Sequence, residues 1–186
     1  ALYSRPKILL LDEPLSAIDP TFRNSIMKSL KDIHKRYDLT TIHVTHNFRE
    51  ASYLANKIAI IMDGKIQQVG SADDVLNHPV NIKVAKFLGF KNIFPATMLG
   101  FSSSSKFYSV DPNVIKVSNS GDLEAEYVFE GEIEECMGIV DHFKIFVNVH
   151  GHQFFIKILK RDYEGCYSDN GKIIKIGFDK KDICFI

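Results

Sequence analysis

The sequence predicts two structural regions: a piece of an α/β sheet in the first half, and a small all-β domain, a barrel or a sandwich, in the second. Three patterns predict this division. An apolar run ends in two acids near residue 12, and a long helical repeat follows it. After about residue 100 the helical repeats give way to short strand-like segments separated by Gly, Asn and Asp. With 186 residues, 45% of them apolar, the chain can hold one ordinary domain or two small ones.

Residues 8–14 (ILLLDEP) are the stretch around which the first half is organised. Four apolar residues without alternation are typical of a strand buried on both faces of a parallel sheet, and Pro14 indicates where the strand ends. Asp12 and Glu13 follow at its carboxyl end, where open α/β sheets bind their ligands. The same carboxylates would also suit a solvated strand end, and this stretch alone leaves both interpretations open.

Local signals predict the next helix and strand. Asp19 and Pro20 match an N-cap and a first helical position, and apolar residues at three- and four-residue steps continue one helix face to about Tyr37. Residues 40–46 are rich in β-branched side chains and predict a second strand with His46 at its carboxyl end. Both predicted strands therefore end in polar side chains.

The rest of the first half carries clear turn and cap signals. An Asp-Gly pair at 63 and 64, between two apolar segments, predicts a hairpin with a type I′ turn. Ser71 with an acid three residues later predicts the start of a helix that ends near residue 78. A further helix is expected to stop at Gly89.

The second half reads as a series of short strands. Phe143, Ile145, Val147 and Val149 alternate strictly along the chain, so this strand is expected to bury one face. The predicted strands cover residues 127–133, 143–149, 153–159, 172–178 and 182–186.

Composition excludes several classes of function. Lys plus Arg and Asp plus Glu are 23 each, so no basic field favours nucleic acid or anionic lipid. No apolar run approaches the length of about 20 residues that spans a membrane, so we expect any membrane association to go through a protein partner. Cys136, Cys166 and Cys184 are odd in number and far apart, which favours reduced thiols with no assigned chemistry.

Two acids and a histidine at neighbouring strand ends suit phosphoryl transfer. An acid beside a triphosphate can hold Mg²⁺ directly or through water, because that ion prefers oxygen ligands. A second acid can orient or deprotonate the attacking water, and a histidine can contact the terminal phosphate. Asp12, Glu13 and His46 are the candidates for these three tasks.

These motifs, taken in order and at their spacing, resemble the ATP-binding cassette (ABC) transporter ATPases of importer type. Residues 8–14 resemble the Walker B strand with its following glutamate, and residues 15–19 (LSAID) resemble the D-loop. Residues 44–46 stand at the position of the switch histidine, and residues 62–71 continue the likeness. The resemblance covers roughly residues 1–92, which would be the carboxyl-terminal part of the ATPase domain, half of a P-loop ATPase sheet.

The resemblance implies a role for each site residue. Asp12 would serve Mg²⁺, Glu13 would be the general base for water, and His46 would contact the γ-phosphate of ATP. Ser16 and Asp19 would communicate across an ATPase homodimer, although Asp19 also suits a simple N-cap. Membrane permease subunits would be partners, and the protein would lie peripherally on the cytoplasmic side of the cell membrane. His43, inside the second strand, is expected to be structural.

The sequence also departs from the family. It contains no GxxxxGK[ST] phosphate loop, no glutamine loop and no LSGGQ-like signature, so we expect this chain to be part of a longer subunit and inactive as an ATPase by itself. Residues 93–186 resemble, more loosely, the TOBE (transport-associated OB) regulatory domain. The pattern is most similar to the molybdate and tungstate importers, which implies an oxyanion as solute and as a ligand of the tail domain.

Three other interpretations stay open at this point. The chain would be a sensor or assembly module with a vestigial ATPase half, an importer ATPase for sugar, polyamine or iron, or an ABC ATPase without a transport role. The acids and histidine retained at positions 12, 13 and 46 count against decay of the ATPase half, and a β-domain without basic patches counts against a role in translation or DNA repair.

Overall fold

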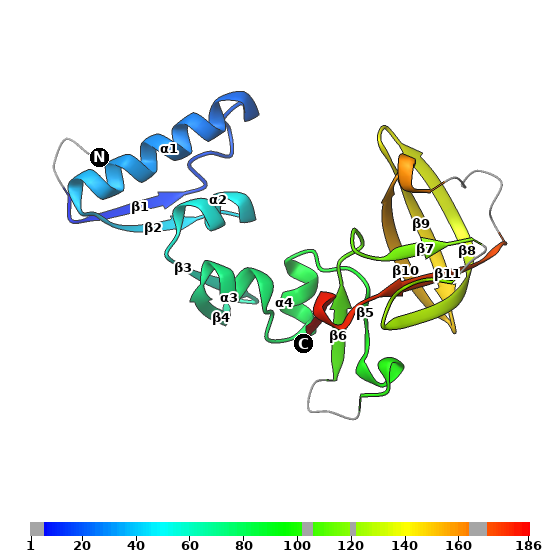
Figure 1. Cartoon of the computed structure of the whole chain (residues 1–186). Helices are drawn as coiled ribbons and strands as arrows, with labels where there is room; N and C mark the ends of the chain where they lie inside the picture. Colours follow the sequence, from blue (N-terminus) through cyan, green and yellow to red (C-terminus); the bar gives the residue numbers. More distant parts are fainter. Residues whose placement is uncertain (1–5, 102–105, 120–121, 164–170) are drawn as a thin grey trace. The chain divides into compact units, whose positions relative to one another are not determined.

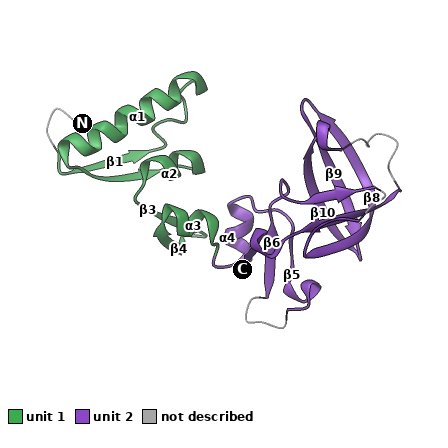
Figure 2. Ribbon diagram, viewed as in Figure 1, with its two compact units in different colours: residues 1–79 green, residues 80–186 purple. Residues whose placement is uncertain are grey.

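The computed structural model describes residues 6–101, 106–119, 122–163 and 171–186. The chain divides into two compact units, residues 1–79 and residues 80–186 (Figure 2). We call them the front unit and the tail unit and describe each by itself. The family resemblance predicts a domain boundary between residues 92 and 93. A boundary between family domains differs from a boundary between compact units, so it stays a prediction.

The front unit is α/β, as the sequence predicts. In chain order it contains β1 (Ile8–Asp12), α1 (Pro20–Tyr37), β2 (Thr40–Val44), α2 (Phe48–Leu54), β3 (Lys57–Met62), β4 (Lys65–Ser71) and α3 (Ala72–Asn77) (Figure 1). Strands β1 and β2 pair in parallel, and β3 and β4 form an antiparallel hairpin. The parallel pairing confirms that the first two predicted strands are neighbours.

Local chemistry explains where these elements begin and end. The Asp19 carboxylate accepts a hydrogen bond from the Thr21 backbone N–H at 2.8 Å and caps α1. Asp63 and Gly64 have φ angles of 52° and 70°, the pair of positive values that a type I′ turn requires. Ser71 caps α3 by accepting from the Asp74 backbone N–H at 3.1 Å. The predicted helix starts and the hairpin are therefore confirmed.

The prediction that the first strand is buried on both faces is wrong. Leu9 is buried, whereas Ile8 and Leu10 on the opposite face of β1 are 58% and 70% exposed, and Ile42 on β2 is 56% exposed. The reason is that β1 and β2 form a sheet of only two strands, and α1 lies along one side of it (Figure 1). Within the described residues the other face has no covering layer.

The tail unit begins with one helix and continues as strands. Its elements are α4 (Ile82–Phe87), β5 (Ile93–Pro95), β6 (Phe107–Val110), β7 (Lys116–Ser118), β8 (Tyr127–Ile139), β9 (His142–Val149), β10 (His152–Leu159), β11 (Ile173–Phe178) and β12 (Ile183–Phe185), with short 3₁₀ turns at Ala96–Leu99, Lys160–Asp162 and Lys180–Asp182. All five predicted strands are present, with ends shifted by a few residues.

Two sheets build the tail unit. The larger has the order β10-β9-β8-β11-β7, and the smaller has the order β12-β6-β5. Strand β8 pairs with both neighbours: residues 127–132 pair with β11, and residues 132–139 pair with β9, with a register shift between Ile133 and Glu135. Such a bulge lets a long strand bend, and Figure 1 shows the strands curving around a common interior. Among the described strands, β10 and β7 each pair with a neighbour on one side only, so the predicted barrel is open.

Alternation in β9 produces the predicted buried face. Ile145, Val147 and Val149 are fully buried, and Phe154, Ile156 and Phe178 join them from β10 and β11. Burying each such side chain contributes about 1.5–3 kcal/mol to folding. Gly131 on β8 permits the close approach of β9, since a Cβ there would lie 2.6 Å from Val147 Cγ1.

One cysteine prediction is also wrong. Cys136 is disulfide-bonded, and the Cys184 thiol, which lies outside that bond, is partly buried. Burial raises the pKa of the Cys184 thiol. Distance along the sequence says nothing about distance in a folded sheet, which is why spacing suggested three separate thiols.

Candidate functional site

The parallel pair β1–β2 delivers two loops to the same edge of the sheet. The register places Asp12 opposite Val44, and the ladder continues one step further with a bond of 3.0 Å from the Glu13 backbone N–H to the Val44 carbonyl. Both chain segments therefore leave the sheet side by side. Thirty-three positions separate Glu13 from His46 in sequence, and this pairing brings them together.

The Glu13 carboxylate and the His46 imidazole are in direct contact. Glu13 Oε1 lies 2.8 Å from His46 Nδ1 and accepts a second bond from the His46 backbone N–H at 3.0 Å. An ionised carboxylate only accepts hydrogen bonds, so the proton of the pair sits on Nδ1. Both bonds use Oε1, which leaves Oε2 of Glu13 and Nε2 of His46 available to a ligand. The side chains are 34% and 78% exposed.

The backbone around Glu13 is shaped by the loop that follows it. Glu13 has a φ of 44°, an uncommon left-handed conformation for a residue with a side chain. Its carbonyl accepts bonds from the Ser16 hydroxyl at 2.8 Å and the Ser16 N–H at 3.2 Å. Leu15, only 2% exposed, anchors the loop in the core of the front unit. Ser16 thus supports Glu13 through its backbone rather than through its carboxylate.

The structure does not bring Asp12 or Asp19 into hydrogen-bond contact with this pair. Asp12 is exposed at the end of β1, and within the described parts of the chain its carboxylate makes no hydrogen bond or ion pair. Asp19 lies at the start of α1, where the Thr21 backbone N–H, then the Thr21 side chain and last the Arg23 charge hold the pKa of its carboxyl below the usual value. Asp19 therefore has the capping role, which is compatible with a further role.

The donor set near Glu13 fits a magnesium nucleotide better than an all-protein metal site. No group of three His, Cys, Asp or Glu side chains suited to a metal occurs among the residues that the structure describes. Mg²⁺ typically takes one or two carboxylates together with waters and phosphate oxygens. The unengaged carboxylate of Asp12 is a donor of that kind.

Sequence reasoning missed Glu50 on α2, which is only 3% exposed. Its Oε2 accepts a bond from the Thr45 hydroxyl at 2.9 Å, next to His46. His43, expected to be structural, is largely buried with its Nε2 3.8 Å from Glu50. An acid four residues after His46, on the first turn of the expected helix, was the available sequence signal.

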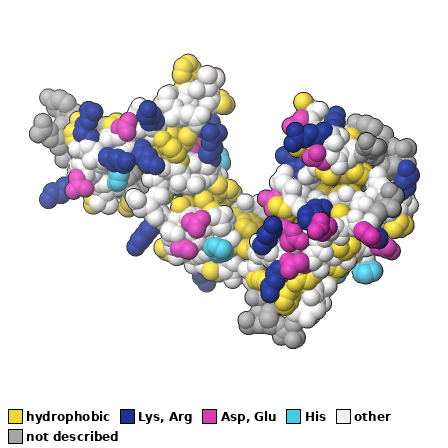
Figure 3. All heavy atoms as spheres, viewed as in Figure 1, with side chains coloured by type: hydrophobic (Ala, Val, Ile, Leu, Met, Phe, Trp, Pro, Cys, Tyr) yellow, Lys and Arg dark blue, Asp and Glu magenta, His cyan; other side chains and the backbone are white. Residues whose placement is uncertain are grey.

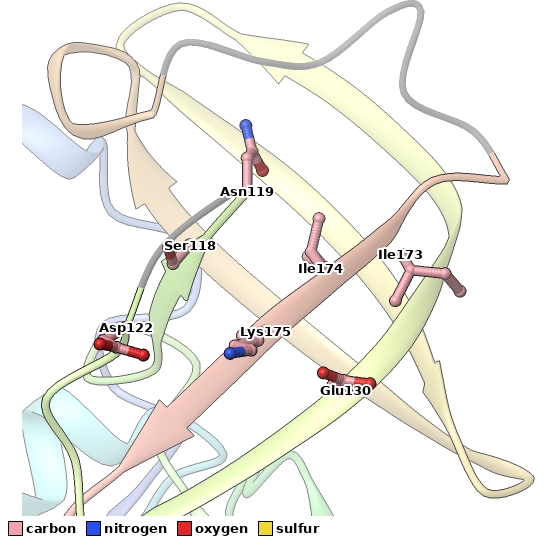
Figure 4. Close-up of a pocket in the computed structure, with 7 residues that line it drawn as sticks. All are labelled: Ser118, Asn119, Asp122, Glu130, Ile173, Ile174 and Lys175. Atoms are coloured by element: carbon pink, nitrogen blue, oxygen red, sulfur yellow. The ribbon is translucent and has the colours of Figure 1, made fainter.

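The tail unit carries a hollow of about 440 Å³ on its larger sheet (Figure 4). Glu130, Lys175 and Ser118 stand opposite one another on β8, β11 and β7, and Asp122 lies beside them. The charged lining is thus two carboxylates and one ammonium group. The described lining therefore carries more negative than positive charge.

Neither a charged patch on the face drawn in Figure 3 nor a membrane-spanning helix stands out in the described part of the chain. On the face drawn in Figure 3, acidic and basic side chains are interspersed within each unit. In the described part of the chain no helix is both long enough and apolar enough to span a bilayer.

Comparison with known proteins identifies relatives along nearly the whole chain. The spermidine/putrescine import ATP-binding protein PotA of the Aster yellows witches'-broom phytoplasma is 33% identical over 196 residues, covering 98% of this chain and 46% of that protein. PotA of Bacteroides thetaiotaomicron is 32% identical, covering 84% of this chain and 37% of that protein. This chain is a homologue of the ATP-binding proteins of ABC importers. The predicted family resemblance is thereby confirmed.

Further comparisons of this ABC importer homologue cover smaller parts of the chain. The probable sulfate/thiosulfate import ATP-binding protein CysA of Chlorella vulgaris is 44% identical over 49% of this chain and 39% of that protein. The chain spans less than half the length of these relatives. No family model matches it. A solved structure of the cytoplasmic molybdate-binding protein ModG matches 47% of this chain and 66% of its own chain. The two are 10% identical with a TM-score of 0.39, a likeness too weak to support a conclusion.

Proposed function

We propose that this chain is the carboxyl-terminal part of an ABC importer ATPase, in which Glu13 and His46 handle the attacking water and the terminal phosphate. The contact of 2.8 Å between Glu13 Oε1 and His46 Nδ1 carries the proposal. It joins the two motifs at the ligand-binding edge of a parallel sheet. The homology to import ATP-binding proteins supports it independently.

Glu13 is the general base in this proposal. Its Oε2 is not engaged by the described residues, so it can accept a proton from a water held at the end of β1. His46 positions the phosphate. Its ring is oriented by the bond from Nδ1 to Glu13, which points Nε2 away from that carboxylate, and contact with a phosphate oxygen requires a proton on Nε2 as well.

Asp12 would hold Mg²⁺ of a bound Mg-ATP, through water. When bound, the ion neutralises charge that develops on the phosphate oxygens. The exposed carboxylate of Asp12 at the strand end fits this task. Ser16 and Asp19 would face a second ATPase subunit in a homodimer, because both are exposed on the loop that follows Glu13.

Partners and location follow from the importer assignment. We propose that membrane permease subunits bind the intact ATPase and hold it at the cytoplasmic side of the cell membrane. The chain itself contains no phosphate loop, so turnover is expected only of a longer protein that supplies one.

For the transported solute we propose a polyamine before an oxyanion. The names of the PotA relatives point to spermidine and putrescine, and CysA points to sulfate. The carboxylates of Asp122 and Glu130 beside Lys175 suit an amine better than molybdate or tungstate. The oxyanion, predicted from the tail domain, is the rival to be tested in the same assay.

The deciding experiment measures Mg²⁺-dependent ATP turnover of the protein that joins this chain to a phosphate-loop-bearing segment encoded with it. Glu13→Gln is expected to lower kcat by about 10²-fold to 10⁴-fold, the range typical of a lost general base. Glu135→Gln, a change to an exposed glutamate of the tail unit, is the matched control and should leave turnover unchanged.

The same assay with spermidine, molybdate and sulfate identifies the solute class through the assembled transporter. Turnover that ignores Glu13→Gln would contradict the catalytic assignment. If the longer protein binds no nucleotide but the tail unit binds a small ion, the sensor interpretation replaces the ATPase.

A further inference from the structure

A buried carboxylate, that of Glu50, holds the residue that precedes His46. Glu50 is 3% exposed, and a charge so deeply buried must be compensated by nearby polar groups. Three groups converge on it: the Thr45 hydroxyl at 2.9 Å, His43 Nε2 at 3.8 Å and Arg23 Nε at 4.0 Å. Both nitrogens are buried and have no hydrogen-bond partner among the described residues, and each lies within 4.0 Å of a Glu50 carboxylate oxygen.

Capping of α2 does not explain this carboxylate. The helix is already capped by Asn47, whose side-chain oxygen accepts from the backbone N–H groups of Arg49 and Glu50 at 3.0 and 3.3 Å. The Glu50 side chain instead reaches back to Thr45, whose hydroxyl oxygen also accepts from the Asn47 N–H at 3.1 Å. Glu50 therefore fixes the residues on both sides of His46.

Arg23 connects the same carboxylate to the other loop. Its Nη2 donates to the Ile18 carbonyl at 3.1 Å, in the segment between Ser16 and Asp19. Its Nε faces Glu50 Oε1. One guanidinium thus donates a hydrogen bond to the loop after β1 and forms an ion pair at 4.0 Å with the acid that holds the loop after β2. An arginine can do this because its fork presents several donors in fixed directions.

We propose that Arg23 and Glu50 are a positioning pair that ties the loop of residues 15–19 to the loop of residues 45–47 and so keeps His46 on Glu13. Neither residue touches a reacting group. Their relevance for catalysis rests on the proposed ATPase function, whereas the positioning itself is a property of this chain. A displacement of one loop would be transmitted through Arg23 and Glu50 to the other.

The test reads the proton position on the His46 ring in the 186-residue chain, labelled with ¹⁵N-histidine and studied by NMR at alkaline pH, where the rings are neutral. The contact with Glu13 places the proton on Nδ1, whereas a free neutral imidazole favours Nε2. Glu50→Ala is expected to make the Nδ1–H form of His46 the minor species. Arg49→Gln, at an exposed position of the same helix, is the control and should leave the spectrum unchanged.

Two milder variants decide the matter if Glu50→Ala disturbs the fold. Thr45→Val removes only the hydroxyl that Glu50 holds, and Arg23→Lys keeps the charge but loses the planar fork that reaches Ile18. Both should lower the Nδ1–H fraction while the amide signals of α1 and α2 stay dispersed. In Glu50→Ala and Thr45→Val, the amide signals of Ile18 and Asp19 should also move. An unchanged His46 ring in any folded variant of the set would overturn the proposal.

ATP turnover separates this inference from the proposed function. In the longer ATPase, Thr45→Val and Arg23→Lys should lower kcat by up to about 10²-fold with little change in KM, since misplacing a group by about 1 Å has effects of this size. If Glu13→Gln is silent in turnover but the His46 tautomer still depends on Glu50, the ATPase assignment fails and the positioning stands. If Glu13→Gln abolishes turnover but the His46 tautomer does not depend on Glu50, the ATPase assignment stands and the positioning proposal fails.

Discussion

The two principal sheets of this chain contain similar apolar side chains but bury them to very different extents. In the tail unit, Ile145 on β9 is fully buried among side chains from neighbouring curved strands. In the front unit, Leu10 and Ile42 on the β1–β2 pair are 70% and 56% exposed. The difference arises because a sheet of five strands with a bulge can curl around its own interior, whereas a sheet of two strands can be covered only by other elements.

This contrast separates stability from chemistry along the chain. The tail unit contains the continuous apolar core, and the front unit contains the Glu13–His46 pair and the charged cluster behind it. The front unit buries a smaller set of apolar side chains, among them Leu15 and Val75, and adds helix caps, loop bonds and the ion pairs of Glu50. Four tests of this contrast follow, beginning with the largest expected effect.

Ile145→Ala and Ile42→Ala compare two strand isoleucines directly. Ile145→Ala, at the buried position, should lower the free energy of unfolding by about 2–5 kcal/mol, because it leaves a cavity. Ile42→Ala, at the exposed position, should change the free energy of unfolding by less than about 1 kcal/mol. Urea titration followed at resolved amide signals of β9 and β2 measures each unit separately. Equal effects would show that the face of β1–β2 is covered in solution.

Gly131→Ala tests how closely the tail strands approach one another. A Cβ at this position would lie 2.6 Å from Val147 Cγ1 and 2.7 Å from the Asn148 carbonyl oxygen, and the backbone atom cannot move aside easily. We expect a loss of about 1–3 kcal/mol in the same titration. Gly70→Ala in β4 is the counterpart in the front unit. Its nearest neighbour would be Val75 Cγ2 at 3.3 Å, so the expected loss is under about 1 kcal/mol.

Asp19→Ala removes the N-cap of α1. The Thr21 N–H then loses its acceptor, and the front unit should lose about 1 kcal/mol, measured at β2 amides. Asp32→Ala, an exposed change within the same helix, should stay within about 0.5 kcal/mol of the wild type. A silent Asp19→Ala would mean that the aspartate does not cap the helix in solution.

Asp179→Asn should reduce the acid sensitivity of the tail unit, the smallest effect of the four. The Glu126 backbone N–H, and then the Lys116 ammonium group, hold the pKa of Asp179 below its ordinary value. An acid with a lowered pKa stabilises the folded state above the pKa of the unfolded chain, and this contribution is lost as the pH falls through the lowered value. Tm measured from pH 6 down to pH 3 should therefore fall less steeply in the variant. Parallel curves would contradict the assignment.

The accuracy of the sequence predictions depended on the range of the interactions involved. The Asp63-Gly64 turn, the Asp19 cap and the alternation of β9 were all predicted, since each depends on residues within a few positions of one another. The meeting of Glu13 and His46 at one sheet edge was predicted because the carboxyl ends of neighbouring parallel strands lie together. The burial of both faces of β1 was predicted wrongly, because an apolar run does not state what covers it.

The sequence by itself determined the order of the strands and helices in the front unit, five of the tail strands, the division into an α/β half and a β half, and the candidate residues Asp12, Glu13 and His46. Only the tertiary structure decided that Glu13 and His46 touch, that Glu50 is buried against Arg23, and that the charged hollow of the tail unit is more acidic than basic. The physical reason is that caps, turns and alternation act over a few residues. A contact between side chains 33 positions apart depends on the strand register and on the helices packed against it.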